Sequence, residues 1–246
     1  MRSQNALELL TVWEQGLSQP LLQRALILLA VALPDSEPEE LAGMSIGRRD
    51  RHLLRLREKL FGPQLVNTSV CPACSERIEW VNQVSDLLIP QDLYQASANR
   101  FTIDVDEYKL CVRLPNSLDI AAVIGNPDTE SAQRQLLTRC VLNVERSGED
   151  CSIERLPDCV IDALIQQIEL LDPQAEILIS LKCPACAHRW DALFDIAGLL
   201  WTELNDWAER MLQTVHQLAS GYGWSERDIL ELSPVRRQLY LGMLGT

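Results

Sequence analysis

Four of the eight cysteines occur in two identical Cys-Pro-Ala-Cys sequences, and cysteine pairs at this spacing are typical metal ligands. The candidate ligands are Cys71, Cys74, Cys183 and Cys186. A structural Zn²⁺ takes four thiolates in a tetrahedron, at about 2.3 Å, and each C-x-x-C turn supplies two of them from one tight loop. The sequence therefore predicts one structural Zn²⁺ per chain, bound by the two knuckles together.

The similarity between the two segments extends beyond the cysteines, at a constant offset of 112 residues. The matched pairs are Arg77 with Arg189, Ile78 with Trp190, Val81 with Leu193, and Leu87-Leu88 with Leu199-Leu200. A metal shared by two related knuckles gives a physical reason for this repetition, because each knuckle must present the same pair of thiolates. Glycine often follows the second cysteine in zinc ribbons, whereas Ser75 and Ala187 stand at these positions here.

Other uses of the cysteines stay open at this point. A thioredoxin-like redox pair would place C-x-x-C between a strand and a helix, whereas the residues after each knuckle favour another strand. Disulfides would require an oxidising compartment, and no secretory signal indicates one. His188 follows Cys186 by two residues and could replace one thiolate. The remaining cysteines lack ligand spacing and are interpreted as ordinary thiols; they are Cys111, Cys140, Cys151 and Cys159.

The segments around the knuckles alternate between apolar and polar residues, which predicts strands. Residues 64–80 form a strand–knuckle–strand pattern, and residues 177–181 form a short strand before the second knuckle. Residues 101–112 predict a hairpin with Asp106-Glu107 at its centre. These strands are expected to position the cysteines.

Helical periodicity dominates the two ends of the chain. The helices expected at the N-terminal end are 7–14, 21–33 and 46–61, with 34–40 as a linker, and those expected at the C-terminal end are 199–219, 226–232 and 234–244. Ser45 is expected to cap the third helix, and Gly62-Pro63 to stop it. Ser225 and Asp228 form a capping-box pattern.

The middle of the chain is expected to hold two further helices. One opens at Asp128 and would place Cys140, Val141 and Val144 on one apolar face. The other runs from about residue 157 to 171 and is closed by Asp172-Pro173.

The sequence thus predicts an α+β fold that is mainly α-helical, with a small β module of zinc-ribbon type between helical parts. The expected domains are an N-terminal helical part, residues 1–63, and a zinc-ribbon and β-hairpin module, residues 64–198. This module carries an acidic helical insert at about 115–175, and a C-terminal helical part follows at 199–246.

The composition argues against several classes of function. The chain has 35 acidic and 22 basic side chains and a net charge of −13, the opposite of what neutralising phosphates requires, so nucleic-acid binding is disfavoured. The longest apolar run, residues 25–33, is half as long as a membrane span, which predicts a cytoplasmic protein. Motifs for phosphate, dinucleotide or catalytic zinc binding are absent from the sequence, so no enzyme activity is expected.

One basic cluster, residues 48–59, lies on the helix predicted at 46–61. Its arginines include Arg48, Arg51 and Arg55, which fall on a different face from Leu53 and Leu56. The cluster is either a solvated helix face or a docking surface for an acidic partner or for the acidic middle of this chain.

Further motifs lie outside the knuckles. In the first part they are Gly47-Arg48-Arg49-Asp50-Arg51, Leu53-Leu54, 58–62, Arg113-Leu114-Pro115 and 136–141. In the last part they are Trp190, Phe194-Asp195-Ile196, Leu200-Trp201, Tyr222-Gly223-Trp224-Ser225-Glu226, Ser233-Pro234 and Arg236-Arg237. With the two Cys-Pro-Ala-Cys sequences, these segments resemble the baseplate hub assembly chaperone family of contractile phage tails and proteins of phage-tail-like contractile injection systems.

This resemblance implies a non-enzymatic, chaperone-like assembly factor for the baseplate and its hub or spike, in a contractile phage tail or a phage-tail-like injection particle. Of the functional residues, only the four knuckle cysteines carry over from the family. Two alternatives stay open, a resident structural component of the baseplate and a cytosolic zinc-ribbon adaptor unrelated to tails.

A partner surface is expected on the C-terminal helices, because aromatic and arginine side chains dominate the energy of protein interfaces. These helices are expected to pack on one another through Trp201, Trp207 and Trp224. A hub or spike protein is expected to dock beside them, and the predicted contact residues are Trp224, Arg236, Arg237 and Tyr240.

Overall fold

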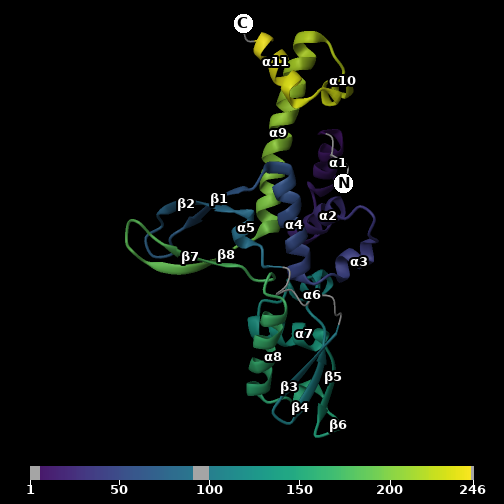
Figure 1. Cartoon of the computed structure of the whole chain (residues 1–246), viewed down its shortest axis with the longest axis vertical. Helices are drawn as coiled ribbons and strands as arrows, with labels where there is room; N and C mark the ends of the chain where they lie inside the picture. Colours follow the sequence, from purple (N-terminus) through teal and green to yellow (C-terminus); the bar gives the residue numbers. More distant parts are fainter. Residues whose placement is uncertain (1–5, 91–99, 245–246) are drawn as a thin grey trace. The chain divides into compact units, whose positions relative to one another are not determined.

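The computed structural model describes residues 6–90 and 100–244, and its α+β, mainly helical architecture confirms the predicted fold class (Figure 1). The chain divides into two compact units. One unit contains the chain up to Val31 together with the chain from Ala197 onward, and the other is Ala32–Ile196. The three-part domain division made from the sequence stays a prediction.

The first unit is helical. Its elements are α1 (Ala6–Gly16), α2 (Leu21–Ala32), α9 (Ile196–Tyr222), α10 (Glu226–Glu231) and α11 (Pro234–Leu244). A small core joins α1, α9 and α10 through Leu10, Ala208 and Leu230, with Trp207 packed against it. Ser225 and Asp228 form the predicted capping box at the start of α10.

Of the tryptophans expected to pack the C-terminal helices on one another, Trp207 packs against the core that includes Leu230 of α10, whereas Trp201 faces the N-terminal helices. The ring of Trp201 covers Gly16 so closely that a side chain at this glycine would collide with it. The Arg24 guanidinium lies 4.5 Å from the centre of the same ring and donates to the carbonyl oxygens of Gly16 and Leu17 at the end of α1. Trp224 alone meets α11, through Tyr240.

The second unit contains two separate antiparallel ribbons, each ending in a knuckle. The first pairs β1 (Gln64–Val70) with β2 (Arg77–Gln83), and the second pairs β7 (Leu178–Lys182) with β8 (Arg189–Leu193). Both ribbons belong to one arm in Figure 1, where their knuckle ends converge. The predicted strands around each Cys-Pro-Ala-Cys sequence are therefore confirmed.

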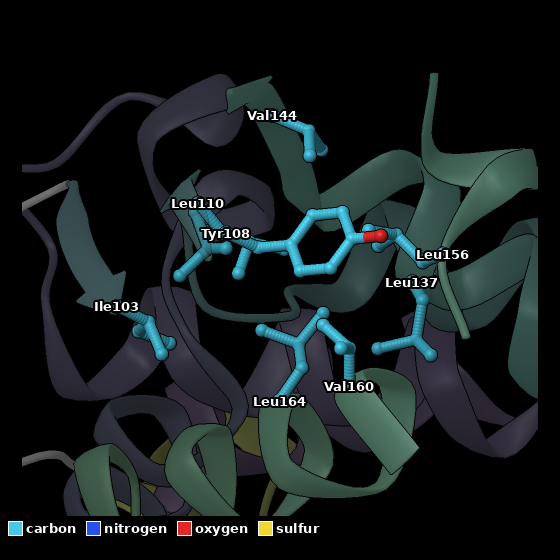
Figure 2. Close-up of a cluster of buried hydrophobic side chains, with 9 residues drawn as sticks. Ile103, Tyr108, Leu110, Leu137, Val144, Leu156, Val160 and Leu164 are labelled. Atoms are coloured by element: carbon cyan, nitrogen blue, oxygen red, sulfur yellow. The ribbon is translucent and has the colours of Figure 1, made fainter. Parts of the chain in front are cut away.

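The same unit contains a four-stranded sheet in the order β3-β4-β5-β6. Its strands are β3 (Phe101–Val105), β4 (Tyr108–Val112), β5 (Val141–Arg146) and β6 (Glu149–Asp150). Two helices, α7 (Thr129–Cys140) and α8 (Asp158–Leu171), contribute to its core. Figure 2 shows Tyr108, Leu110 and Val144 of the sheet among Leu137, Leu156, Val160 and Leu164.

Val141 and Val144 do not continue the helix that Asp128 caps, which corrects the prediction from the sequence. The helix ends at Cys140, whose carbonyl oxygen accepts from Arg113 N at 2.9 Å, and the chain turns into β5. Val144 then pairs with Leu110 across the strands and is buried. The insert predicted as helical therefore supplies half of the sheet, because apolar alternation over β5 is satisfied by pairing with the hairpin.

The remaining α-helices of this unit are α3 (Pro38–Gly43), α4 (Ile46–Phe61), α5 (Val84–Leu87) and α6 (Ser117–Val123), and a short 3₁₀ helix covers Ile153–Arg155. The predicted linker at 34–40 is thus partly helical, because Pro38 is favourable at a helix start. Ser45 caps α4 as predicted, and Gly62 ends it with φ at +90°, a conformation that favours glycine. Gly47 in the first turn donates its N–H to Asp172 Oδ2 at 2.9 Å.

Candidate metal centre

The two knuckles bring the four predicted ligands together. The sulfur atoms of Cys71, Cys74, Cys183 and Cys186 all lie within 4.8 Å of one another. The closest cross-knuckle separations are 3.6 Å between Cys71 and Cys186 and 3.5 Å between Cys74 and Cys183. Four thiolates in a tetrahedron around an ion at about 2.3 Å would lie roughly 3.8 Å apart. The cluster therefore fits a four-thiolate metal ion closely, and the eight cysteines are all free of disulfides.

The backbone of one knuckle reproduces that of the other. Cys71 N donates to Glu76 O at 2.8 Å, and Cys183 N donates to His188 O at 2.9 Å. The residue after the second cysteine has positive φ in both, +62° at Ser75 and +61° at Ala187. Glycine is the usual residue in this conformation, and other residues cost roughly 1–2 kcal/mol. The two knuckles accept this strain because it closes the turn that aims both sulfurs at one point.

The thiols of the cluster have divergent pKa values. Backbone N–H groups of Cys186 and Ala185 stabilise the Cys183 thiolate and lower its pKa to about 7, against the opposing effect of desolvation. The amide of Glu76 lowers the pKa of Cys74, but hydrogen bonds with the other three sulfurs outweigh it and raise that pKa to about 12. Four close sulfurs cannot all ionise without a cation among them, and a bound divalent ion would remove that conflict.

His188 does not join the cluster. The clustered ligand atoms found among residues 6–90 and 100–244 are the four sulfurs. The His188 ring instead stacks on Trp190, with ring centres 5.9 Å apart. Cys140 is fully buried, and burial raises the pKa of its thiol to about 11, so this cysteine is an apolar core residue as predicted.

The basic helix α4 is only partly available to a partner. Arg51 donates to the carbonyl oxygen of Ile89, and Arg55 forms an exposed ion pair with Glu58 at 2.8 Å. Arg48 is half-buried. Burial, reinforced by Arg48 and Arg51, lowers the pKa of His52. Partner binding by Arg48, Arg51 and Arg55 stays a prediction.

The C-terminal candidates fall into two groups. Trp224 stacks on Tyr222 at 4.6 Å between ring centres and meets Tyr240 edge-on at 4.8 Å, so these rings hold α9 and α11 together. Arg237 is buried, and its Nη1 donates to Leu230 O at 3.1 Å and to Leu232 O at 2.7 Å. The expectation that a partner contacts Arg237 is corrected here, because this guanidinium satisfies the carbonyls at the end of α10.

Arg236 is exposed and remains a candidate contact residue. Sequence reasoning missed its two apolar neighbours, Val235 and Leu239, which lie one helical turn apart on α11 and are both exposed. Apolar residues at this spacing usually mark the buried face of a helix, so the sequence pattern alone suggested burial.

Two further buried polar residues, Gln174 and Asp119, join segments that are distant in the sequence, and the sequence analysis did not identify them. Gln174 accepts from Ile89 N at 2.8 Å and donates to Leu87 O at 2.9 Å, which ties the segment before β7 to the segment after β2. Asp119 is fully buried and accepts from both Arg113 and Arg139. No local motif reveals such partners, since they come together only in the folded chain.

Fold and site together define a small α+β protein whose two β-ribbons meet at a closed four-cysteine centre. The family model described as T4 bacteriophage base plate protein matches residues 22–201, which is more than half of the chain, and the chain belongs to this family. All four clustered cysteines lie within the matched residues, whereas α10 and α11 follow them. No curated protein and no solved structure matches the chain. None of the described helices is long and apolar enough to cross a membrane.

Proposed function

We propose that this chain is a non-enzymatic, chaperone-like assembly factor for the baseplate and its hub or spike, acting in the bacterial cytoplasm where the particle is built. Membership of the base plate protein family is the observation that carries the proposal. The closed four-cysteine centre supports a binding role over a catalytic one, because four thiolates leave a metal no open position for water.

The metal in this proposal is one structural Zn²⁺ per chain. Cys71 and Cys74 would hold it from the first ribbon, and Cys183 and Cys186 from the second. Zn²⁺ suits a tetrahedral all-thiolate set and undergoes no redox chemistry. Its role here is to fix the knuckle ends of two ribbons that do not share a sheet.

The docking surface for the hub or spike protein is the exposed side of α11. Val235 and Leu239 supply apolar contact, and Arg236 supplies the positive charge beside them. The helix carries no acidic residue, although the whole chain has a net charge of −13. A partner with an acidic rim around an apolar patch complements this surface. The edge-on contact between Tyr240 and Trp224 holds α11 against the end of α9.

Substitution on α11 tests the docking surface more sharply than deletion does, because Leu230 of α10 packs on Leu10 and removing α10 would open that core. We expect Leu239→Glu to abolish co-purification with the hub or spike protein from cells that make the whole particle. Gln238→Glu adds the same charge at the neighbouring exposed position and is the matched control. Equal recovery of the partner with both variants would exclude α11 as the docking surface.

A second candidate function is that of a resident baseplate component, which the description of the family as a base plate protein favours. Quantitative mass spectrometry of purified particles separates the two. A chaperone is present on assembly intermediates and absent from mature particles, whereas a resident subunit appears in them at a fixed stoichiometry. Deleting the gene should prevent baseplate formation in either case. If the protein were a zinc-ribbon adaptor unrelated to tails, the deletion would leave baseplate formation intact.

A further inference from the structure

The outward faces of the two ribbons present residues of the same types in the same order. Along β2 the exposed side chains are Arg77, Glu79 and Val81, and along β8 they are Arg189, Asp191 and Leu193. These residues correspond at the offset of 112 that also relates the knuckles. Each ribbon thus carries a row of arginine, carboxylate and apolar residue at every second position, roughly 7 Å apart.

The partner strand of each ribbon extends the match. Val66 pairs with Val81, and Leu178 pairs with Leu193, at corresponding positions. The four side chains are similarly exposed, at 60%, 58%, 54% and 65% in that order. Thr68 faces Glu79 and Ser180 faces Asp191, so a hydroxyl lies opposite the carboxylate in both ribbons. Single exposed apolar residues are ordinary, but a cross-strand apolar pair repeated on two ribbons is not.

The opposite, more shielded faces of the ribbons match less closely. Ile78 corresponds to Trp190, but Asn67, Trp80 and Asn82 of the first ribbon correspond to Ile179, Ala192 and Phe194 of the second. In the first ribbon Trp80 Nε1 donates to Asn82 Oδ1 at 2.8 Å, a contact that the second ribbon cannot make. Packing normally restricts shielded faces more than exposed ones. Here the exposed faces agree in residue type at five of six corresponding positions, Val70 against Lys182 being the exception, whereas the shielded faces agree less, so the agreement points to a cause outside the fold.

We propose that the two outward faces are equivalent docking sites for two subunits of one oligomeric partner protein. The partner segment carries an acidic, a basic and an apolar side chain in a row of the same spacing, so that each meets its complement on the ribbon. The ion pair between Arg77 and Glu79, at 3.5 Å, does not compete strongly, since both side chains are about two-thirds exposed. This surface is separate from α11 and is independent of the proposed docking there.

A second copy of this chain does not cover the whole of either face. If two such rows lie antiparallel and in register, their carboxylates face each other and each arginine faces an apolar residue. If the rows shift by two residues, each arginine faces a carboxylate, but the exposed apolar pair of each copy then lies beyond the paired residues and stays uncovered. If they lie parallel, every charge faces its like, which is destabilising. The two rows have the same order, so pairing the first ribbon of one copy with the second ribbon of another gives the same mismatch. The occupant is therefore a different protein.

Site-specific photo-crosslinking in cells that make the whole particle tests this proposal. The photo-crosslinking amino acid p-benzoylphenylalanine replaces Val81 in one full-length protein and Leu193 in another. Ile124 of the same unit, also exposed at 69%, is the control position. We expect positions 81 and 193 to crosslink to the same segment of one tail protein, identified by mass spectrometry, and position 124 not to do so. Crosslinks to different segments, to a second copy of this chain, or to nothing would overturn the proposal.

Reversing the charged row tests its chemistry without changing the net charge. The double variant Arg77→Glu with Glu79→Arg should lower the crosslinking yield at position 81 by roughly tenfold or more while leaving position 193 unchanged. The double variant Arg189→Asp with Asp191→Arg should lower the crosslinking yield at position 193 and leave the yield at position 81 unchanged. Unchanged metal content shows that the ribbons remain folded. Full crosslinking after reversal would exclude recognition by this row, and this result is independent of the outcome for Leu239→Glu.

Discussion

The sulfur atoms of Cys74 and Cys183 lie 3.5 Å apart, although 109 residues separate them in the sequence. The sheet β3-β4-β5-β6 with α7 and α8 falls entirely between these cysteines and has its own core. The chain therefore leaves the first ribbon, builds a separate hydrophobic core, and returns to complete the centre. A metal ion at this place closes a long loop, and its binding free energy becomes folding free energy for the two ribbons.

Replacing Cys71 or Cys183 by serine should remove the metal and destabilise the protein. We expect the purified chain to contain about one zinc, measured by mass spectrometry or a chromophoric chelator. Either variant should lose most of it and melt roughly 10 °C lower, since the ribbons lose their common anchor. The control is Cys159→Ser, at an exposed cysteine outside the cluster. Zinc retained by the double variant Cys71→Ser with Cys183→Ser would disprove the assignment.

Gly47→Ala should destabilise the second unit strongly. An added Cβ would collide with the Asp172 carboxylate and lie 2.8 Å from Ala175 N, a backbone atom that cannot move aside cheaply. The same shift would weaken the hydrogen bond from Gly47 N to Asp172, so we expect a loss of about 2–4 kcal/mol in the free energy of unfolding, measured with urea. Gly43→Ala should be nearly neutral, because that Cβ would meet nothing within 4 Å. Equal midpoints for the two variants would contradict this prediction.

Asp119→Asn should cost about 3 kcal/mol, because it leaves the guanidinium groups of Arg113 and Arg139 without their carboxylate. Burial tends to raise the pKa of Asp119, but hydrogen bonds from Arg113, from the Asn116 backbone and from Arg139 outweigh it and lower the pKa below 3.8. A lowered pKa in the folded state means that this stabilisation is fully present well above the ordinary carboxyl pKa of 3.8 and is lost as the pH falls through the lowered pKa. The gap in unfolding free energy between wild type and Asp119→Asn should therefore narrow below pH 4. A gap that is constant from pH 7 to pH 2 would exclude an ionised Asp119.

Arg237→Met should loosen α10 and α11 without touching the ribbons. The substitution removes the donors to Leu230 O and Leu232 O, at a cost of about 2 kcal/mol. Backbone amides of both helices should exchange with deuterium faster, whereas amides of β1, β2, β7 and β8 should keep their rates. Arg236→Met alters an exposed side chain and should leave exchange unchanged. If the two variants exchanged alike, the buried guanidinium would have no structural role.

The features that were predicted correctly from the sequence depend on residues close together in the chain: the cysteine spacing, the helix caps and the hairpin. The knuckle cysteines cluster as expected, because their spacing encodes a turn and the repeat demands a shared ligand. Ser45 begins α4 and Gly62 ends it, as expected, because a capping residue contacts only the adjacent turn of its helix. The hairpin at 101–112 is confirmed as β3 and β4, with Asp106 at positive φ in its turn.

The parts that could not be foreseen depend on partners distant in sequence. The positions of Val141 and Val144 in the sequence are compatible with one face of a helix and also with a strand. The segment forms a strand because it pairs with β4. Arg237 looks like an interface arginine until the carbonyls at the end of α10 surround it. The outward faces of the ribbons could be recognised only when the strand register showed which residues share a face.

The distance between the two knuckles also affects how the protein is made. Cys71 and Cys74 leave the ribosome as half of a binding site, and Cys183 follows Cys74 by 109 residues. At bacterial elongation rates this takes roughly 6–20 s. During that interval neighbouring nascent chains on one messenger RNA expose identical half-sites, and a metal ion can join two first knuckles into a non-native four-cysteine site. Fast translation through the intervening sheet therefore favours pairing of the two knuckles within one chain, and slow codons there would favour metal bridges between chains.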